Sequence, residues 1–224
     1  GFREVVLLGQ TVNSYHDGTR DSAQDEFVEL VNSTNGGINL AGWTIRTHSP
    51  SSATEAVRHT FGANTTLPPG EAMVVFGGGT FNAADPLFDC AQVVKASSGG
   101  LSLTNGGLTI LVRDGSGSLV TQFSYGGATS LNGGNAQSLT RSPDISGPFV
   151  LHTTAAGASG RKFSSGVKVD GTPFGNCKLM FNPRSTIGNW SQYAQPKRKK
   201  RPIPNRIERP TCGLASPGCR LRGP

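Results

Sequence analysis

Residues 25–45 read DEFVELVNSTNGGINLAGWTI, and residues 59–70 read HTFGANTTLPPG. A β-branched run, an Asn-Gly-Gly turn, a second run centred on Trp43 and a Leu-Pro-Pro-Gly turn follow one another at close spacing. From Trp43 to Arg46 apolar and polar residues alternate, which is the period of a half-buried strand. Trp43 is large enough to fill the space between two sheets, so we expect it to anchor a core.

Short runs of this kind recur along the chain, separated by turns that contain glycine. Asn-Gly and Asp-Gly pairs supply the positive φ that tight turns need, and Asp114-Gly115 between two alternating segments predicts a hairpin. Short strands with regular turn signals and no helical pattern predict an all-β protein, an antiparallel β-sandwich. The expected strands cover residues 4–8, 27–31, 43–46, 72–76, 92–94, 108–113, 119–125 and 137–141.

The order of these elements resembles the lamin tail domain, an immunoglobulin-like β-sandwich of nuclear lamins and of many exported bacterial proteins. Residues 101–125 (LSLTNGGLTILVRDGSGSLVTQFSY) resemble the hairpin of that family, and residues 137–150 (QSLTRSPDISGPFV) resemble its closing strand. The resemblance covers residues 3–155 and implies a non-catalytic binding or structural module. Its ligand is then an unknown protein or polymer, held by the loops of the sandwich.

Charge divides the chain into two regions. Residues 1–177 carry 10 Lys and Arg against 13 Asp and Glu, a net charge of −3, whereas residues 178–224 carry 11 against one, a net charge of +10. A break this sharp indicates two physically different regions. We expect a sandwich at 1–155, an extension at 156–177 packed on it or trailing it, and a basic, Pro-rich, disordered tail at 178–224.

The tail contains one run of five consecutive cations: Lys197, Arg198, Lys199, Lys200 and Arg201. Such a run resembles a nuclear-import sequence, and it also suits binding of nucleic acid or another polyanion. Trp190 and Tyr193 lie just upstream, where they could stack on bases. The alternative is a solvated charge run without a specific ligand, and the sequence leaves both open.

The sequence contains no motif of a familiar enzyme class, such as a nucleophile elbow, a phosphate-binding loop, a dinucleotide fingerprint or an HExxH zinc motif. Four histidines are dispersed, with His59 in a further expected strand and His16, His48 and His152 in expected loops. We therefore predict that the chain is not an enzyme, with no catalytic residue and no cofactor.

Five acidic residues gather before and within the second expected strand: Asp17, Asp21, Asp25, Glu26 and Glu29. Loop carboxylates of this kind can hold Ca²⁺, but the spacing is not that of an EF-hand loop. Glu26 and Glu29 would also face opposite sides of a strand. We expect solvated carboxylates and no metal site.

Cys90, Cys177, Cys212 and Cys219 lack the CxxC spacing of a zinc site. In an exported protein Cys212 could pair with Cys219 and Cys90 with Cys177, whereas a reducing compartment would leave free thiols. The family resemblance favours an extracellular or cell-surface location, and the basic run favours a nuclear or nucleoid one. No apolar run reaches the roughly 18 residues that span a bilayer.

Overall fold

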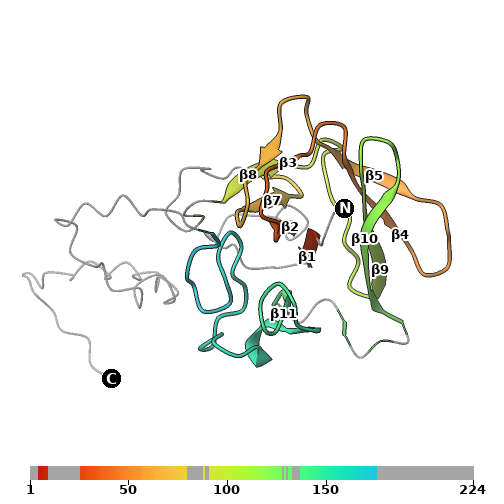
Figure 1. The fold of residues 1–224 in the computed structure, drawn as a ribbon. Helices are drawn as coiled ribbons and strands as arrows, with labels where there is room; N and C mark the ends of the chain where they lie inside the picture. The colour runs from red at the N-terminus through yellow and green to blue at the C-terminus, as the bar shows by residue number, and fades with distance from the viewer. Residues whose placement is uncertain are drawn as a thin grey trace, which may run out of the picture. The chain divides into compact units, whose positions relative to one another are not determined.

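The computed structural model describes residues 5–9, 26–79, 88, 91–127, 129, 131–132 and 137–175 of the chain. The chain divides into two units, Gly1–Met180 and Phe181–Pro224, and every described residue belongs to the first (Figure 1). The cations at 197–201 and the four cysteines lie outside the described residues. The described part is all-β, and its one helical turn is the 3₁₀ helix η1 (His152–Thr154).

Two four-stranded sheets make up the sandwich (Figure 1). The first sheet has the order β1 (Val5–Gly9), β2 (Phe27–Asn32), β7 (Ala72–Phe76) and β8 (Gln92–Lys95). The second has the order β10 (Leu119–Gly126), β9 (Gly107–Arg113), β4 (Thr44–His48) and β5 (Ala56–Thr60). All neighbours are antiparallel except β7 and β8, which are parallel. The predicted immunoglobulin-like sandwich is confirmed, with one parallel pair in it.

Two further strand pairs include three strands that the sequence did not predict. β3 (Ile38–Asn39) pairs with β6 (Thr66–Leu67), and β11 (Leu139–Arg141) pairs with β12 (Phe149–Leu151). Only β11 lies within an expected strand, residues 137–141; the other three strands carry too few residues to show an alternation.

The main core lies between the two sheets and is built from alternate residues of their strands. Trp43 is buried in it, as predicted, whereas Phe123 packs against its margin and stays partly exposed. Strands contribute the following buried residues to this core: Val28, Leu30, Met73, Val75, Ile45, Leu108, Ile110 and Val112.

The first sheet is buried on its other face as well. There Phe27, Val74 and Phe76 pack with Phe88, and the partly buried Phe163 lies against them. Val31 and Ala72 form another cluster on that face with Phe174. All five residues of β7 are therefore buried, which is why this strand reads as an unbroken apolar run.

The segment that covers this face, residues 137–175, approaches the rest of the fold closely at two glycines. Gly166 has a φ of +84°, its N–H donates to Glu29 Oε1 at 2.7 Å, and a Cβ there would lie 3.0 Å from Phe88 O. Gly175 has a φ of +73°, and its Cβ would lie 2.9 Å from Gly70 O. Both positions combine left-handed backbone with tight packing, so both require glycine.

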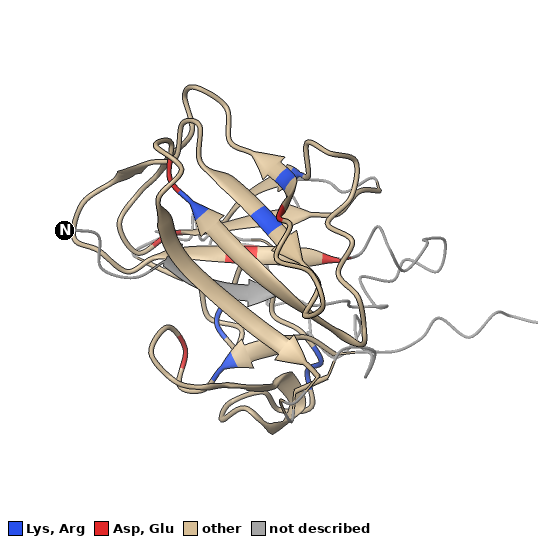
Figure 2. Ribbon diagram, turned by 90° about the vertical axis from the view of Figure 1, so that its right-hand side faces the viewer, with Lys and Arg blue, Asp and Glu red and all other residues tan. Residues whose placement is uncertain are grey.

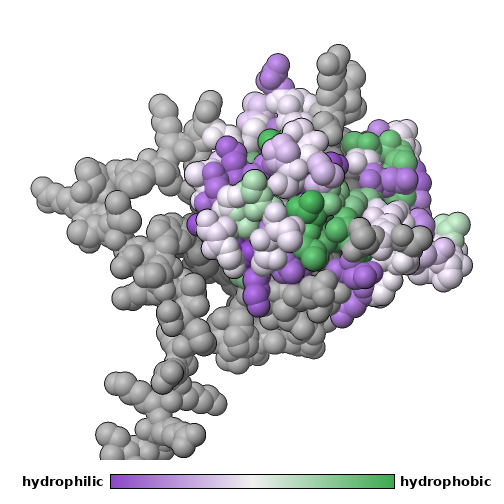
Figure 3. Space-filling model, turned by 90° about the horizontal axis from the view of Figure 1, so that it is seen from below, coloured by the Kyte–Doolittle hydropathy of each residue, from purple (hydrophilic) through white to green (hydrophobic). Residues whose placement is uncertain are grey.

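The β11–β12 hairpin supplies an aromatic and cationic stack at the margin of the core. The rings of Phe149 and Phe123 lie 3.8 Å apart, and the guanidinium of Arg141 lies 4.5 Å from the Phe149 ring. Ile145 and Leu151 are partly exposed near them. Seen from below, the side on which β11 lies in Figure 1, the surface carries a gathering of hydrophobic side chains among hydrophilic ones (Figure 3).

The predicted hairpin after Arg113 is confirmed, but its turn differs from the expected one. Residues 114–118 form the loop, and the positive φ of +86° belongs to Gly117 rather than to Gly115. Asp114 Oδ1 accepts hydrogen bonds from the N–H groups of Ser116 and Ser118, each at 2.9 Å. The aspartate side chain therefore organises a five-residue loop, as Asx turns do.

Replacing Gly166 by Ala should destabilise the fold more than replacing Gly160. Both glycines have positive φ, +84° and +79°, so both alanines carry backbone strain of roughly 1–2 kcal/mol. At Gly160 a Cβ meets nothing within 4 Å, whereas at Gly166 it meets packed backbone at 3.0 Å. We expect the Gly166 variant to lose about 1–3 kcal/mol more of its free energy of unfolding than the Gly160 variant, as measured by urea unfolding. Equal losses would contradict close packing of residues 137–175 on the sheet.

Candidate functional site

The outward face of the second sheet, here called the arginine face, is set by strand register. Ile45, Ile110 and Val112 point into the core, so their neighbours along β4 and β9 point outward. Pairing across the four strands arranges the outward residues in three rows: Leu119, Arg113, Thr44 and Thr60; Gln122, Leu111, Arg46 and Val57; Ser124, Thr109 and His48. In Figure 2 the sheet that faces the viewer carries basic residues on its strands.

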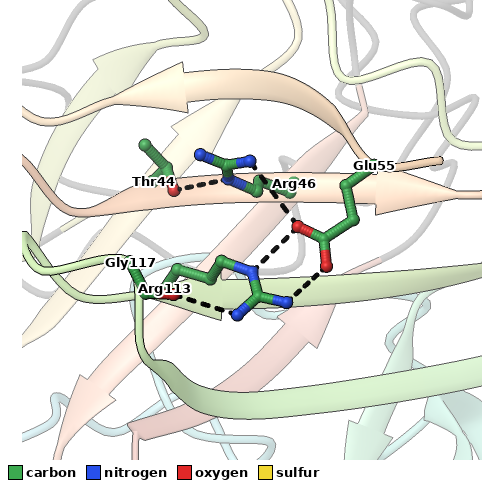
Figure 4. Close-up of polar contacts among 5 residues, drawn as sticks. All are labelled: Thr44, Arg46, Glu55, Arg113 and Gly117. Atoms are coloured by element: carbon green, nitrogen blue, oxygen red, sulfur yellow. Dashed lines mark hydrogen bonds and ion pairs between the residues drawn. The ribbon is translucent and has the colours of Figure 1, made fainter.

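Arg46 and Arg113 converge on the carboxylate of Glu55 (Figure 4). Arg113 Nε donates to Glu55 Oε2 at 2.8 Å, and Arg113 Nη2 donates to Oε1 of the same group. Arg46 Nη1 lies 3.6 Å from Glu55 Oε2, while Arg46 Nε donates to Thr44 Oγ1 at 3.0 Å. Arg113 Nη1 donates to Gly117 O at 3.0 Å, which ties the guanidinium to the β9–β10 loop.

The electrostatics of this cluster favour the charged forms of Glu55 and Arg113. Hydrogen bonds from Arg113, followed by the charges of Arg113 and Arg46, lower the pKa of Glu55. The hydrogen bond to Glu55 in turn raises the pKa of Arg113. Two cations meet one anion, so the cluster keeps one positive charge that Glu55 does not balance.

Two β-bulges shape the arginine face. One interrupts the pairing of β4 with β5 at Ile45/Arg46, and the other interrupts β9–β10 pairing at Leu119/Thr121. Bulges re-aim side chains and are frequent beside functional sites. Val57 and Leu119, which lie at opposite edges of this face, are the two large hydrophobic residues exposed in the described part of the chain.

Comparison with known families identifies the fold. A family model described as Lamin Tail Domain matches residues 11–127. The chain belongs to the lamin tail domain family. Lamin tail domains are immunoglobulin-like and non-enzymatic. No curated protein matches the chain. Residues 137–175, which cover the first sheet, lie beyond the matched part, although the sequence resemblance extended to residue 155.

The expectation of solvated carboxylates was wrong for two residues of the lamin tail domain. Glu26 and Glu29 are buried on opposite sides of the first sheet. Glu26 Oε2 accepts a hydrogen bond from Leu103 N–H at 3.0 Å, and burial raises the pKa of Glu26 to about 7. Glu29 Oε1 accepts from Gly166 N–H, and burial raises the pKa of Glu29 well above its usual range. The other three acids of the cluster lie outside the described residues.

Two histidines of the domain serve internal contacts. His59 lies in a strand, β5, as predicted; it is buried there, and its Nδ1 accepts from Ser97 N–H at 3.2 Å. The loop prediction was wrong for two histidines. His48 ends β4, and His152 begins η1, where its Nδ1 donates to Arg161 O at 2.9 Å. Burial lowers the pKa of the His59 and His152 imidazoles. Within the described ranges no three His, Cys, Asp or Glu side chains come close enough to hold a metal ion.

The described residues of the lamin tail domain contain no helix that is long and apolar enough to cross a bilayer.

Sequence reasoning missed the arginine face, although part of its signal was present. The alternation around Trp43 already placed Thr44 and Arg46 on one face of a strand. The partners Glu55 and Arg113 come from a loop and from a strand almost 70 residues further along, so only the β4–β9 register of the folded chain brings them together.

Glu26→Gln should remove a pH dependence of stability. The pKa of Glu26 is about 7 in the fold and 4.5 when unperturbed, so between these values the folded state binds more protons than the unfolded one. This stabilisation is fully present below about pH 4.5 and is lost as the pH rises through about 7, by about 3 kcal/mol in all. Glutamine stays neutral. The free energy of unfolding of the variant should therefore exceed that of the parent by up to about 3 kcal/mol at about pH 8 and by much less at about pH 4.

Urea unfolding across this pH range measures the effect. Glu71→Gln makes the same change in net charge at a partly exposed position and serves as the control. Parallel pH profiles for the parent and the Glu26 variant would contradict the buried environment of this carboxyl group.

Proposed function

We propose that the protein is a non-catalytic binding module of the lamin tail type that works in an exported or cell-surface protein. The family match to residues 11–127 carries this proposal. Support comes from the internal use of its titratable groups, because Glu26, Glu29, His59 and His152 are buried against backbone groups. A ligand would then meet the hairpin loops and the outward strands, which expose arginine, amide and hydroxyl groups.

The purified full chain should cleave neither duplex DNA nor casein, with Mg²⁺, Ca²⁺ or Zn²⁺ added, because His59 and His152 are engaged in the fold. A nuclease and a protease assayed in parallel provide positive controls. Cleavage that disappears in His59→Gln or His152→Gln would contradict the proposal.

Fractionation of the producing cells tests the proposed location separately. Recovery of the native protein from the medium or the cell surface is expected, whereas recovery with chromosomal nucleic acid would favour the nuclear or nucleoid alternative.

A second candidate function rests on the distribution of charge. Residues 178–224 carry +10, while residues 1–177 carry −3. We propose that Lys197, Arg198, Lys199, Lys200 and Arg201 bind polyanions such as nucleic acid without sequence preference. Cations that neutralise phosphates release condensed counterions, which makes such binding steeply dependent on salt.

A salt titration of duplex DNA binding by the full chain measures this directly. Each neutralised phosphate contributes a slope of about −0.9 in log K against log salt, so the five cations should give about −4 to −5. Changing all five to Gln should remove most of that slope. A matched variant changes five scattered tail cations to Gln: Lys178, Arg184, Arg206, Arg209 and Arg220.

Equal losses in the two tail variants would show that net charge, and not the cluster, determines binding. Trp190→Ala should weaken binding of single strands only, because paired bases leave no free face for stacking.

A further inference from the structure

The Glu55 carboxylate already occupies the position in which an external acid would be recognised. Arg113 donates two parallel N–H hydrogen bonds to it. From the neighbouring strand, Arg46 Nη1 lies 3.6 Å from Glu55 Oε2. A planar guanidinium that meets both oxygens of one carboxylate is a geometry selective for that group. The two arginines together carry one more positive charge than Glu55 balances.

This contact is accessible and replaceable. The side chains of Arg46, Arg113 and Glu55 are 30%, 25% and 19% exposed. Ion pairs at such positions contribute little to stability, because water solvates their separated members well. The 3.6 Å separation also exceeds the usual hydrogen-bond length, so Arg46 Nη1 is available to donate to an incoming oxygen.

Glu55 stands on a segment that can move without disturbing either sheet. It is the last residue of the loop 49–55 between β4 and β5, and residues 50–54 are exposed. Residues 51–54 form hydrogen bonds within the loop, such as the one from Thr54 N–H to Ser52 Oγ at 3.2 Å. Withdrawal of Glu55 therefore costs contacts with the two arginines and little else.

The exposed hydrophobic residues set the size of the ligand. Val57 and Leu119 lie on the outer strands of the four-stranded sheet, one row apart, which separates them by about 16 Å. In an extended peptide residues i and i+4 lie about 13 Å apart on one face, with i+2 between them. The side chains of the two end residues extend this reach, so a peptide with an acidic residue between two apolar residues would cover both hydrophobic residues while its carboxylate meets the arginines.

We propose that the arginine face binds an extended acidic segment of a partner protein, whose carboxylate takes the place of Glu55 between Arg46 and Arg113. Glu55 acts as an internal competitor that holds the two guanidinium groups in position when no partner is bound. The apolar residues that flank the partner's acid pack on Val57 and Leu119. This site is separate from the basic tail and does not depend on polyanion binding there.

A nuclear magnetic resonance titration of the full-length chain tests the proposal at the site itself. The probe is the blocked peptide acetyl-Leu-Ser-Glu-Ser-Val-amide, and the signals followed are the Nε–Hε groups of Arg46 and Arg113. Both signals should shift and saturate with this peptide. Glu55→Gln should tighten binding by about two- to fivefold, the range expected when an exposed competing ion pair is removed. Glu71→Gln, with the same change in net charge, should leave the affinity unchanged.

Three results would overturn the assignment. The first is an equal response to the peptide with Gln in place of Glu, which would make the carboxylate irrelevant. The second is equal tightening by Glu55→Gln and Glu71→Gln, which would reduce the effect to overall charge. The third is a shift with a phosphoserine peptide but none with the glutamate peptide, which would assign the face to phosphorylated partners instead. Arg113→Gln should abolish the saturable shift at Arg46, and its amide spectrum shows whether that variant remains folded.

Discussion

Glu29 accepts a hydrogen bond from Gly166 in the middle of a sheet that is buried on both faces. A carboxyl group in such a place is costly unless it stays neutral and keeps a hydrogen-bond partner. Residues 137–175 supply that partner, and their side chains cover the apolar side of β2 and β7. If this face of the first sheet were exposed to water, the hydrogen bond from Gly166 to Glu29 and the apolar packing on β2 and β7 would both be lost. The sandwich therefore depends on a segment that lies beyond the family match.

The two sheets of the sandwich consequently have different tasks. Both faces of the first sheet are packed against other parts of the protein, and its acids are buried. Only one face of the second sheet is packed in the core, and the other face carries Arg46, Arg113 and Glu55 at the surface. Any function that needs a strand surface, within the described part of the chain, therefore falls to the second sheet. Its bulges at Arg46 and near Leu119 change the direction of side chains on the face that remains free.

Local patterns were sufficient to predict most of the fold. Alternation and β-branched runs located the main strands, and the size of Trp43 indicated its place in the core. The same patterns failed where the outcome depended on distant partners. Glu26 and Glu29 were expected to be solvated because their hydrogen-bond donors, Leu103 and Gly166, lie far away in the sequence. The arginine face was missed for the same reason, since strand register decides which residues become neighbours.

Three glutamates show how one side chain takes different roles in different surroundings. Glu29 is fully buried, and the loss of solvation raises its pKa well above the usual range. Glu26 keeps a pKa of about 7, because backbone N–H groups and Arg58 partly offset burial. Glu55 lies at the surface beside two arginines, which lower its pKa and keep it ionised. Only an ionised, solvated carboxylate can exchange its place with that of another molecule at little cost, because neither its charge nor its hydration must change greatly. The acid that helps to hold the fold together therefore lies within the first sheet, and the acid proposed to yield to a ligand lies in a loop beside the outward face of the second.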